Sequence, residues 1–403
     1  MPIYAEARDN LLSNWKTKLI HSQANVPQGF RSLVTPVFRG STTLFERAAD
    51  AVDHWDHDES PYSYGLYGTP TALELAARIA ELEHGKKTFL TPGGQSAISL
   101  INLALLKAGD HVLLPESVYG PNANFAAEML GKFGVDVQTY TPTVGEGISA
   151  DLRANTRLIW CESPGSVTME VQDVRAIAEV AHRAGALVVL DNTYSAGVYF
   201  DAFAHGVDVS MQALTKYIGG HSDLLLGSVT TNDHAVYKSL GAASQQLGLT
   251  VSPDDCALAL RGMQTLAVRL AAIQSAAIRI AKWIAARPEV EIVLHPALPS
   301  CPGHDLWLRD FTGSTGVFSF VLKKRYRRQD VVDFIDRLRL FPVGYSWGGV
   351  TSLAVPWTAG AHRPNWAYGE RLIRLHIGLE EIDDLLADLT RSFEALPAYG
   401  PGA

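Results

Sequence analysis

Seven short strand-like runs, largely continuous in apolar residues, restrict the fold of this 403-residue chain most strongly. They lie at 88–90, 111–114, 135–140, 158–161, 187–190, 207–210 and 224–229, with helical patterns between them. Continuous apolar strands are typical of a sheet that helices cover on both faces. Their alternation with helices predicts an α/β fold with a mainly parallel sheet. Ligands of such sheets gather at the carboxyl ends of the strands.

The pattern changes to a long helix after this region. Residues 258–284 carry apolar side chains at helical spacing, over a length that can bridge two domains. Farther on, 317–322 and 373–377 alternate like half-covered strands, and helices are predicted near 329–340 and 380–395. This combination predicts a smaller C-terminal α+β domain with its helices on one sheet face.

Residues 1–65 show little sustained periodicity and cannot form a core of their own. A helix start follows at Thr69-Pro70, with the helix predicted over 71–83. The predicted division is therefore an N-terminal arm at 1–65, an α/β domain at 66–257 and an α+β domain at 258–403.

Composition excludes several classes of partner. The net charge is −8, and the largest basic run is at 323–328, which argues against nucleic acid and anionic membranes. Cys161, Cys256 and Cys301 show no CxxC spacing, so neither a disulfide framework nor a metal site is indicated. No apolar signal segment begins the chain, and no uninterrupted apolar run reaches the length of a membrane span. We expect a cytoplasmic protein without metal.

A lysine and an aspartate follow two of the buried runs. Lys216 precedes Gly219-Gly220 and has no carboxylate within four residues on either side. Desolvation would lower its pKa and make the amine nucleophilic, although a surface lysine at a strand end would give the same pattern. Asp191 directly follows the run at 187–190. Together they suggest pyridoxal 5′-phosphate (PLP), with the lysine as Schiff-base partner and the aspartate keeping the pyridine nitrogen protonated.

At this point the sequence resembles a known family, the Cys/Met-metabolism PLP-dependent enzymes of fold type I. Within that family it is most similar to the bacterial cystathionine β-lyases. The matching segments are 162–171, 190–193, 212–217, 220–223, 295–299, 309–314, 345–349 and 372–380. The resemblance implies a PLP-dependent transferase-like fold with a mainly parallel seven-stranded sheet. It also implies a homotetramer, a dimer of dimers, whose N-terminal arm lies on a neighbouring subunit and contributes to that subunit's site.

The resemblance assigns cofactor roles to four further residues. The turn at 91–97 lies between a strand and a helix, where backbone amides can hold a phosphate, although a plain loop would also explain it. The family's phosphate loop lies at this place, which implicates the amides of Gly94 and Gln95. Thr215 would offer its hydroxyl to the same phosphate. Tyr119 would stack on the pyridine ring and assist proton transfer.

Substrate contacts follow from the C-terminal segments. Arg374 lies inside an alternating run, where its guanidinium either faces solvent or binds an anion. A bidentate grip on an α-carboxylate suits guanidinium geometry, and the resemblance implies that role. Ser346 and Trp347 would line the same pocket. Ser166 stands where related γ-enzymes carry an asparagine, which is typical of the β-lyase branch.

The arm departs from the family pattern. There, a tyrosine is followed two residues later by an arginine that reaches the phosphate of the adjacent subunit, and β-lyases often carry a second arginine next. Here Tyr64 is followed by Leu66 and Tyr67, and Asn124 replaces an acid expected near the far end of the substrate pocket. We expect PLP to be bound more weakly, through Tyr64, Gly94, Gln95 and Thr215, with Tyr64 also lining the substrate site.

The predicted function is that of a carbon–sulfur β-lyase. It would convert L-cystathionine, or a related cysteine S-conjugate, to a thiol (homocysteine), pyruvate and ammonia, with Lys216 as general base. A γ-lyase or γ-replacement synthase on the same scaffold is one alternative. A scaffold protein without turnover is another, although it would not need Lys216, Asp191, Tyr119 and Arg374 together.

Overall fold

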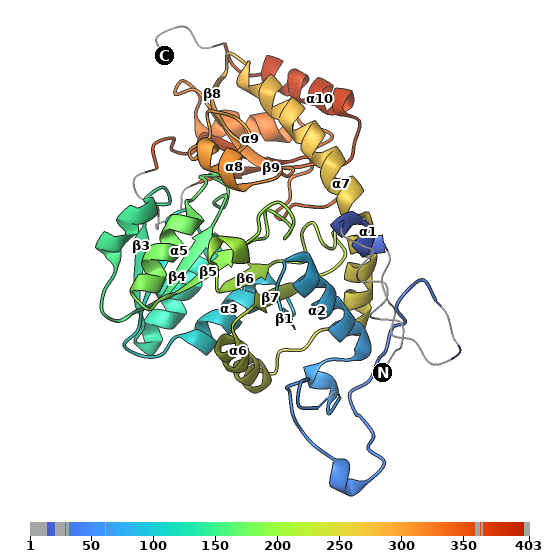
Figure 1. The fold of residues 1–403 in the computed structure, drawn as a ribbon. Coiled ribbons are helices and arrows are strands. Elements are labelled where there is room, and N and C mark those ends of the chain that lie inside the picture. Colours follow the sequence, from blue (N-terminus) through green and yellow to red (C-terminus); the bar gives the residue numbers. More distant parts are fainter. Residues whose placement is uncertain are drawn as a thin grey trace.

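The computed structural model describes residues 14–20, 29, 32–60, 62–358, 363 and 366–398. A seven-stranded sheet forms its larger part, in the order β1-β7-β6-β5-β4-β2-β3 (Figure 1). β7 runs opposite to the other six strands of this sheet, so the expected mainly parallel sheet is confirmed. The strands are β1 (Lys87–Thr91), β2 (His111–Pro115), β3 (Asp136–Tyr140), β4 (Thr156–Glu162), β5 (Leu187–Asp191), β6 (Val209–Gln212) and β7 (Gly227–Thr231).

Helices cover both faces of this sheet, which explains the continuous apolar runs. In β4, Leu158 and Trp160 pack with α3 (Gly94–Leu105) and α6 (His234–Leu247), while Ile159 and Cys161 pack with α5 (Val174–Arg183). Alternate residues of a strand point to opposite faces, so every position must be apolar when both faces are covered. The remaining helices of this part are α2 (Pro70–Leu82) and α4 (Gly120–Phe125).

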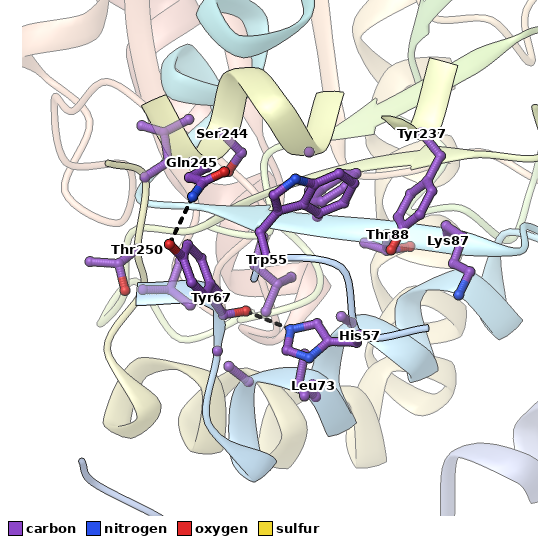
Figure 2. Close-up of a pocket in the computed structure, with 18 of the residues that line it drawn as sticks. Trp55, His57, Tyr67, Leu73, Lys87, Thr88, Tyr237, Ser244, Gln245 and Thr250 are labelled. Atoms are coloured by element: carbon purple, nitrogen blue, oxygen red, sulfur yellow. Dashed lines mark hydrogen bonds between the residues drawn. The ribbon is translucent and has the colours of Figure 1, made fainter. Parts of the chain in front are cut away.

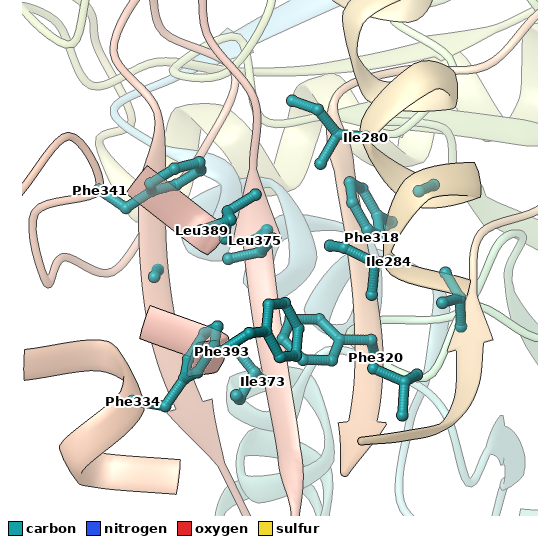
Figure 3. Packing of buried hydrophobic residues seen from close by; sticks show 14 of the residues in the cluster. Ile280, Ile284, Phe318, Phe320, Phe334, Phe341, Ile373, Leu375, Leu389 and Phe393 are labelled. Carbon is teal, nitrogen blue, oxygen red and sulfur yellow. The ribbon is translucent and has the colours of Figure 1, made fainter. Parts of the chain in front are cut away.

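A second, antiparallel sheet in the order β10-β11-β9-β8 forms the C-terminal part. Its strands are β8 (Val290–Leu294), β9 (Val317–Leu322), β10 (Leu353–Trp357) and β11 (Leu372–His376), and its helices are α8 (His304–Asp310), α9 (Arg328–Asp336) and α10 (Ile382–Glu394). Phe320 of β9 packs with Phe334 of α9 and Phe393 of α10, and Phe318 lies near Ile280 and Ile284 (Figure 3). The basic run at 323–328 leads into α9 and ends at its first residue, Arg328.

The expectation of half-covered strands is wrong for β9, because all six of its residues are buried. Its second face packs against the larger part of the molecule, with Val317 and Val321 beside Val167 and Met169. The Ser319 hydroxyl donates to the Val167 carbonyl oxygen over 2.6 Å. The polar residue of this strand, Ser319, therefore faces a partner within the chain instead of water.

Helix α7 (Pro253–Ala285) runs beside both sheets (Figure 1). It begins five residues before the predicted start at 258, because the Ser252 hydroxyl accepts a hydrogen bond from the Asp254 amide and Pro253 occupies the first turn. Among the described helices it alone has the length and apolar composition of a membrane span, and half of that apolar stretch is buried within the protein. It packs against α2, β8, β9 and α10.

The predicted arm is only partly free of its own chain. Helix α1 (Trp15–Ile20) packs against α7 and buries Leu19 there. The described segment that begins at residue 32 extends away from the sheets in Figure 1, with Leu33 and Leu44 92% and 89% exposed. Residues 1–13, 21–28, 30, 31 and 61 of the arm lie outside the described residues. Its packing on a neighbouring subunit and the limits at 65 and 257 remain predictions.

We expect Phe320→Ala to lower the free energy of unfolding by about 3–5 kcal/mol, because the ring is fully buried and its removal leaves a cavity. Urea denaturation measures the change. Phe133→Ala removes the same ring from a position that is 58% exposed, and should change the free energy by less than about 1 kcal/mol. Equal losses in the two variants would contradict the packing in Figure 3.

Candidate active site

Two carboxylic acids end neighbouring strands of the large sheet. Asp191 is the last residue of β5, Glu162 is the last residue of β4, and the two lie opposite each other in the parallel register. Burial raises the pKa of Glu162 well above its ordinary value, and the charge of Asp191 raises it further. Burial also raises the pKa of Asp191, and the hydrogen bonds from Thr193 oppose this shift. No role is assigned to Glu162 from the sequence. Like Asp191, however, it directly follows an apolar run that is predicted as a strand, and this position could have identified it.

Lys216 lies in a turn after β6, at the same edge of the sheet. Its ammonium donates to Ser346 Oγ over 2.5 Å and lies 5.3 Å from the centroid of the Trp347 ring. Burial is the main cause that lowers the pKa of Lys216 to about 8, and the charge of Arg374 adds to it, while Asp191 acts in the opposite direction. A larger fraction of this amine is therefore neutral near pH 7 than of an ordinary lysine.

Arg374 of β11 joins the same cluster from the small sheet. Its Nη2 donates to the Ser346 carbonyl oxygen over 3.1 Å, and burial lowers its pKa to about 10, so it remains a cation. Within the described part of the chain no carboxylate pairs with it. A largely buried guanidinium with unused donors is suited to an anionic ligand, which favours the anion alternative over a solvent-facing side chain.

Tyr119 follows β2 and lies close to both acids. Its backbone N–H donates to Glu162 Oε2 over 2.6 Å. Burial raises the pKa of the phenol, the charges of Asp191 and Glu162 raise it further, and Arg374 lowers it. The side chain is 43% exposed, so one side of the ring remains open to a ligand.

The start of α3 borders the turn that carries Lys216. Gly94 packs so closely on this turn that an added Cβ would lie 2.8 Å from the Cβ of Ala213. The first amides of a helix have no partner within the helix and can bind a phosphate. Gln95 is next, with Oε1 buried and without a hydrogen-bond partner. The Thr215 hydroxyl already donates to the Leu226 carbonyl (3.2 Å) and accepts from the Leu226 amide (3.1 Å), so a phosphate would have to compete for it.

These residues fit PLP. The α3 amides suit its phosphate, the largely buried Lys216 amine suits its aldehyde, and Asp191 suits its ring nitrogen. An unpartnered buried Gln95 oxygen is also what a missing polar ligand would leave.

Tyr64 does not reach this cluster within the chain. It is 46% exposed, its backbone pairs with Thr42, and its ring lies against Tyr67. No contact among the described residues joins it to Lys216 or Arg374, so its role in the site of a neighbouring subunit remains a prediction. Asn124 is exposed on α4.

Leu66 and Tyr67 instead line a pocket of about 310 Å³ together with residues of α2, β1 and α6 (Figure 2). The Tyr67 hydroxyl donates to Asp53 over 2.7 Å and accepts from Gln245 over 2.9 Å. Trp55 lines the same pocket, and none of the predicted site residues does. Tyr67 therefore links the arm to α6 of its own chain. An arginine at this position could donate to Asp53 but could not accept the hydrogen bond from Gln245.

Comparison with known proteins decides the family. Residues 16–394 match the family model described as Cys/Met metabolism PLP-dependent enzyme. The chain belongs to this family. It is 43% identical to a putative cystathionine β-lyase of Rhizobium johnstonii, over 97% of this chain and 99% of that protein. It is 38% identical to the cystathionine β-lyase MetC of Escherichia coli, over 94% of this chain and 97% of that protein.

The fold agrees with this membership. The structure superimposes on a cystathionine γ-synthase of Xanthomonas oryzae pv. oryzae, in complex with aminoacrylate and cysteine, with a TM-score of 0.87. The two sequences are 30% identical, and the match covers 94% of this chain and 98% of the other. Fold type I and dependence on PLP, both expected from the sequence, are therefore confirmed.

In the cofactor-free protein, we expect Lys216 to reach half-maximal reductive methylation near pH 8, because burial favours its neutral form. Peptide mass spectrometry after labelling at a series of pH values measures this midpoint. The exposed Lys324 in the same sample shows that the reagent works across the range. A midpoint above about pH 10, as for an unperturbed lysine, would contradict the environment described here.

Proposed function

We propose that this protein is a PLP-dependent carbon–sulfur β-lyase that acts on L-cystathionine or a related cysteine S-conjugate. The observation that carries the proposal is the Lys216 amine, with its lowered pKa, beside Ser346, Arg374 and Asp191. The Rhizobium and Escherichia relatives that carry a β-lyase name support it over nearly the whole chain.

The cofactor would be held by residues of both sheet edges and of the arm. We assign the ring nitrogen to Asp191, the ring face to Tyr119 and the covalent attachment to Lys216. Gly94, Gln95 and Thr215 would hold the phosphate, with Tyr64 supplied by a neighbouring subunit. Bound PLP supplies an electron-withdrawing ring that stabilises negative charge at the substrate Cα.

The side chains of this protein then perform the binding and proton transfers. Arg374 exchanges the Ser346 carbonyl for the α-carboxylate of the substrate, a stronger, charge-assisted acceptor. Ser346 and Trp347 line the space beside it. Lys216 would take the Cα proton in its neutral form, which makes up a larger fraction near pH 7 than for an ordinary lysine. Tyr119 keeps its proton because its pKa is raised, so it can donate to the sulfur that leaves Cβ.

The γ-enzymes of the same fold are the second candidate, since a cystathionine γ-synthase shares this structure at 30% identity. Ser166, which favours the β-lyase branch, lies beside the segment that leads to Tyr119, because its amide donates to the Ser117 carbonyl over 2.8 Å. A related cysteine S-conjugate remains an alternative substrate, given Leu66, Tyr67 and Asn124.

We also propose a homotetramer in the cytoplasm with active sites shared between subunits. Leu33 and Leu44 of the arm are exposed, and large apolar side chains favour burial. This supports the proposal that a second copy of the chain covers the arm. The net charge of −8 supports the absence of nucleic-acid partners.

Supplied with L-cystathionine, the PLP-loaded enzyme should release pyruvate and homocysteine in equal amounts. Separate assays for each 2-oxo acid measure the outcome. 2-Oxobutyrate as the product would establish the γ-lyase alternative instead. Turnover of djenkolate, cystine or S-alkyl cysteines without turnover of cystathionine would assign the enzyme to smaller conjugates.

Arg374→Lys should raise KM for cystathionine about 10- to 100-fold, because a point-like ammonium cannot form the paired bonds of a guanidinium with a carboxylate. Steady-state kinetics measure the change. Arg371→Lys is the matched control, since Arg371 lies just before the same strand but pairs with Glu291. Equal effects of the two substitutions would place the substrate carboxylate elsewhere.

A further inference from the structure

The turn at 345–349 contacts both the side chain and the backbone of Lys216. Ser346 accepts the hydrogen bond from the Lys216 ammonium, and its backbone has a φ of +83°, a left-handed conformation that is costly for a residue other than glycine. Gly348 passes so close to the backbone of Lys216 that an added Cβ would lie 2.9 Å from its carbonyl carbon. A small displacement of this turn would therefore move the Ser346 hydroxyl away from the Lys216 amine and let water reach that amine.

Two side chains of β11 hold the turn in this strained conformation. Arg374 and His376 are two residues apart, so both point to the same face of the strand. Arg374 binds the Ser346 carbonyl, and His376 Nε2 lies 2.9 Å from the Gly349 carbonyl oxygen and 3.1 Å from the Gly348 amide nitrogen. Among the described residues, His376 is the one whose side chain hydrogen-bonds the backbone of Gly348 or Gly349.

The imidazole of His376 is neutral at physiological pH. It is 1% exposed, and burial is the main cause that lowers its pKa to about 4; the bond to Gly349 opposes this shift, while the charges of Arg374 and Lys216 add to it. A neutral imidazole carries one ring hydrogen, so Nε2 either donates to Gly349 or accepts from Gly348. Both bonds fix the same turn. Nδ1 has no hydrogen-bond partner, so the anchoring rests on Nε2.

We propose that His376 is a positioning residue for Lys216, which acts by holding the turn that carries Ser346 through its Nε2 atom. This inference rests on the role proposed for Lys216 but not on the identity of the substrate. When Arg374 exchanges Ser346 for the substrate carboxylate, His376 is the side chain that keeps the turn against the lysine. The histidine itself touches neither the lysine amine nor, in this arrangement, the substrate.

Two substitutions of His376 by amide side chains distinguish the role of Nε2 from that of Nδ1. In His376→Gln the side-chain nitrogen takes the place of Nε2, whereas in His376→Asn the shorter amide ends near the place of Nδ1. Both remain polar, so they match in chemistry and differ in reach. The readout is the pH midpoint of Lys216 methylation in the full-length cofactor-free chain, which requires no turnover.

We expect His376→Gln to keep the midpoint of the unaltered protein. His376→Asn should raise it by about one pH unit, because water reaches an amine whose low pKa comes mainly from burial. In the PLP-loaded enzyme, His376→Asn should lose about 10- to 100-fold in kcat/KM, as expected for a displaced reacting group.

His295→Asn is the matched control. His295 is also fully buried, and its Nδ1 accepts from the Ala297 amide, but it has no contact with the turn. We expect it to leave the Lys216 midpoint unchanged even if the protein becomes less stable. The proposal is overturned if the two amide variants share one midpoint, or if His295→Asn shifts it as much as His376→Asn. Absence of pyruvate with the expected midpoints would refute the proposed function alone.

Discussion

The hydrogen bond between Lys216 and Ser346 joins the two halves of the molecule at the point where chemistry would occur. The lysine comes from the carboxyl edge of the large sheet, and the serine from a turn that the small sheet holds. A buried amine needs an acceptor, and here the acceptor is supplied 130 residues along the chain. The position of one sheet relative to the other therefore decides whether the lysine meets this acceptor.

Burial shifts the ionisable groups of the cluster toward their neutral forms. The pKa of Lys216 falls to about 8, and the pKa values of Asp191 and Glu162 rise. Lys216 is therefore closer to exchanging a proton at neutral pH than an ordinary lysine, as acid–base catalysis requires. Clustered groups shifted by burial and by one another are a frequent property of active sites, and they support the membership of the family independently of its motifs.

The arm shows how the chain adapts where it departs from the family pattern. Tyr67 occupies a position where an arginine was expected, and its hydroxyl bridges Asp53 and Gln245. Trp55 is seated on Gly241, where any side chain would collide with its ring, and Asp56 is buried beneath the Tyr237 hydroxyl. The base of the arm is thus anchored firmly on its own chain, whereas Leu33 and Leu44 before it are exposed.

The sequence by itself determined the seven strands of the large sheet, the long helix α7 and the edge at which Lys216 and Asp191 lie, because apolar periodicity and glycine positions are local properties. Strands β8 and β10 were not among the predicted elements. The family motifs added Tyr119, Arg374, Ser346 and the phosphate turn. Only the tertiary structure decided that Glu162 faces Asp191, that β9 is buried on both faces and that His376 holds the turn beside Lys216. These are contacts between segments far apart in the chain, and burial and pKa depend on the groups that folding brings together rather than on neighbours in the sequence.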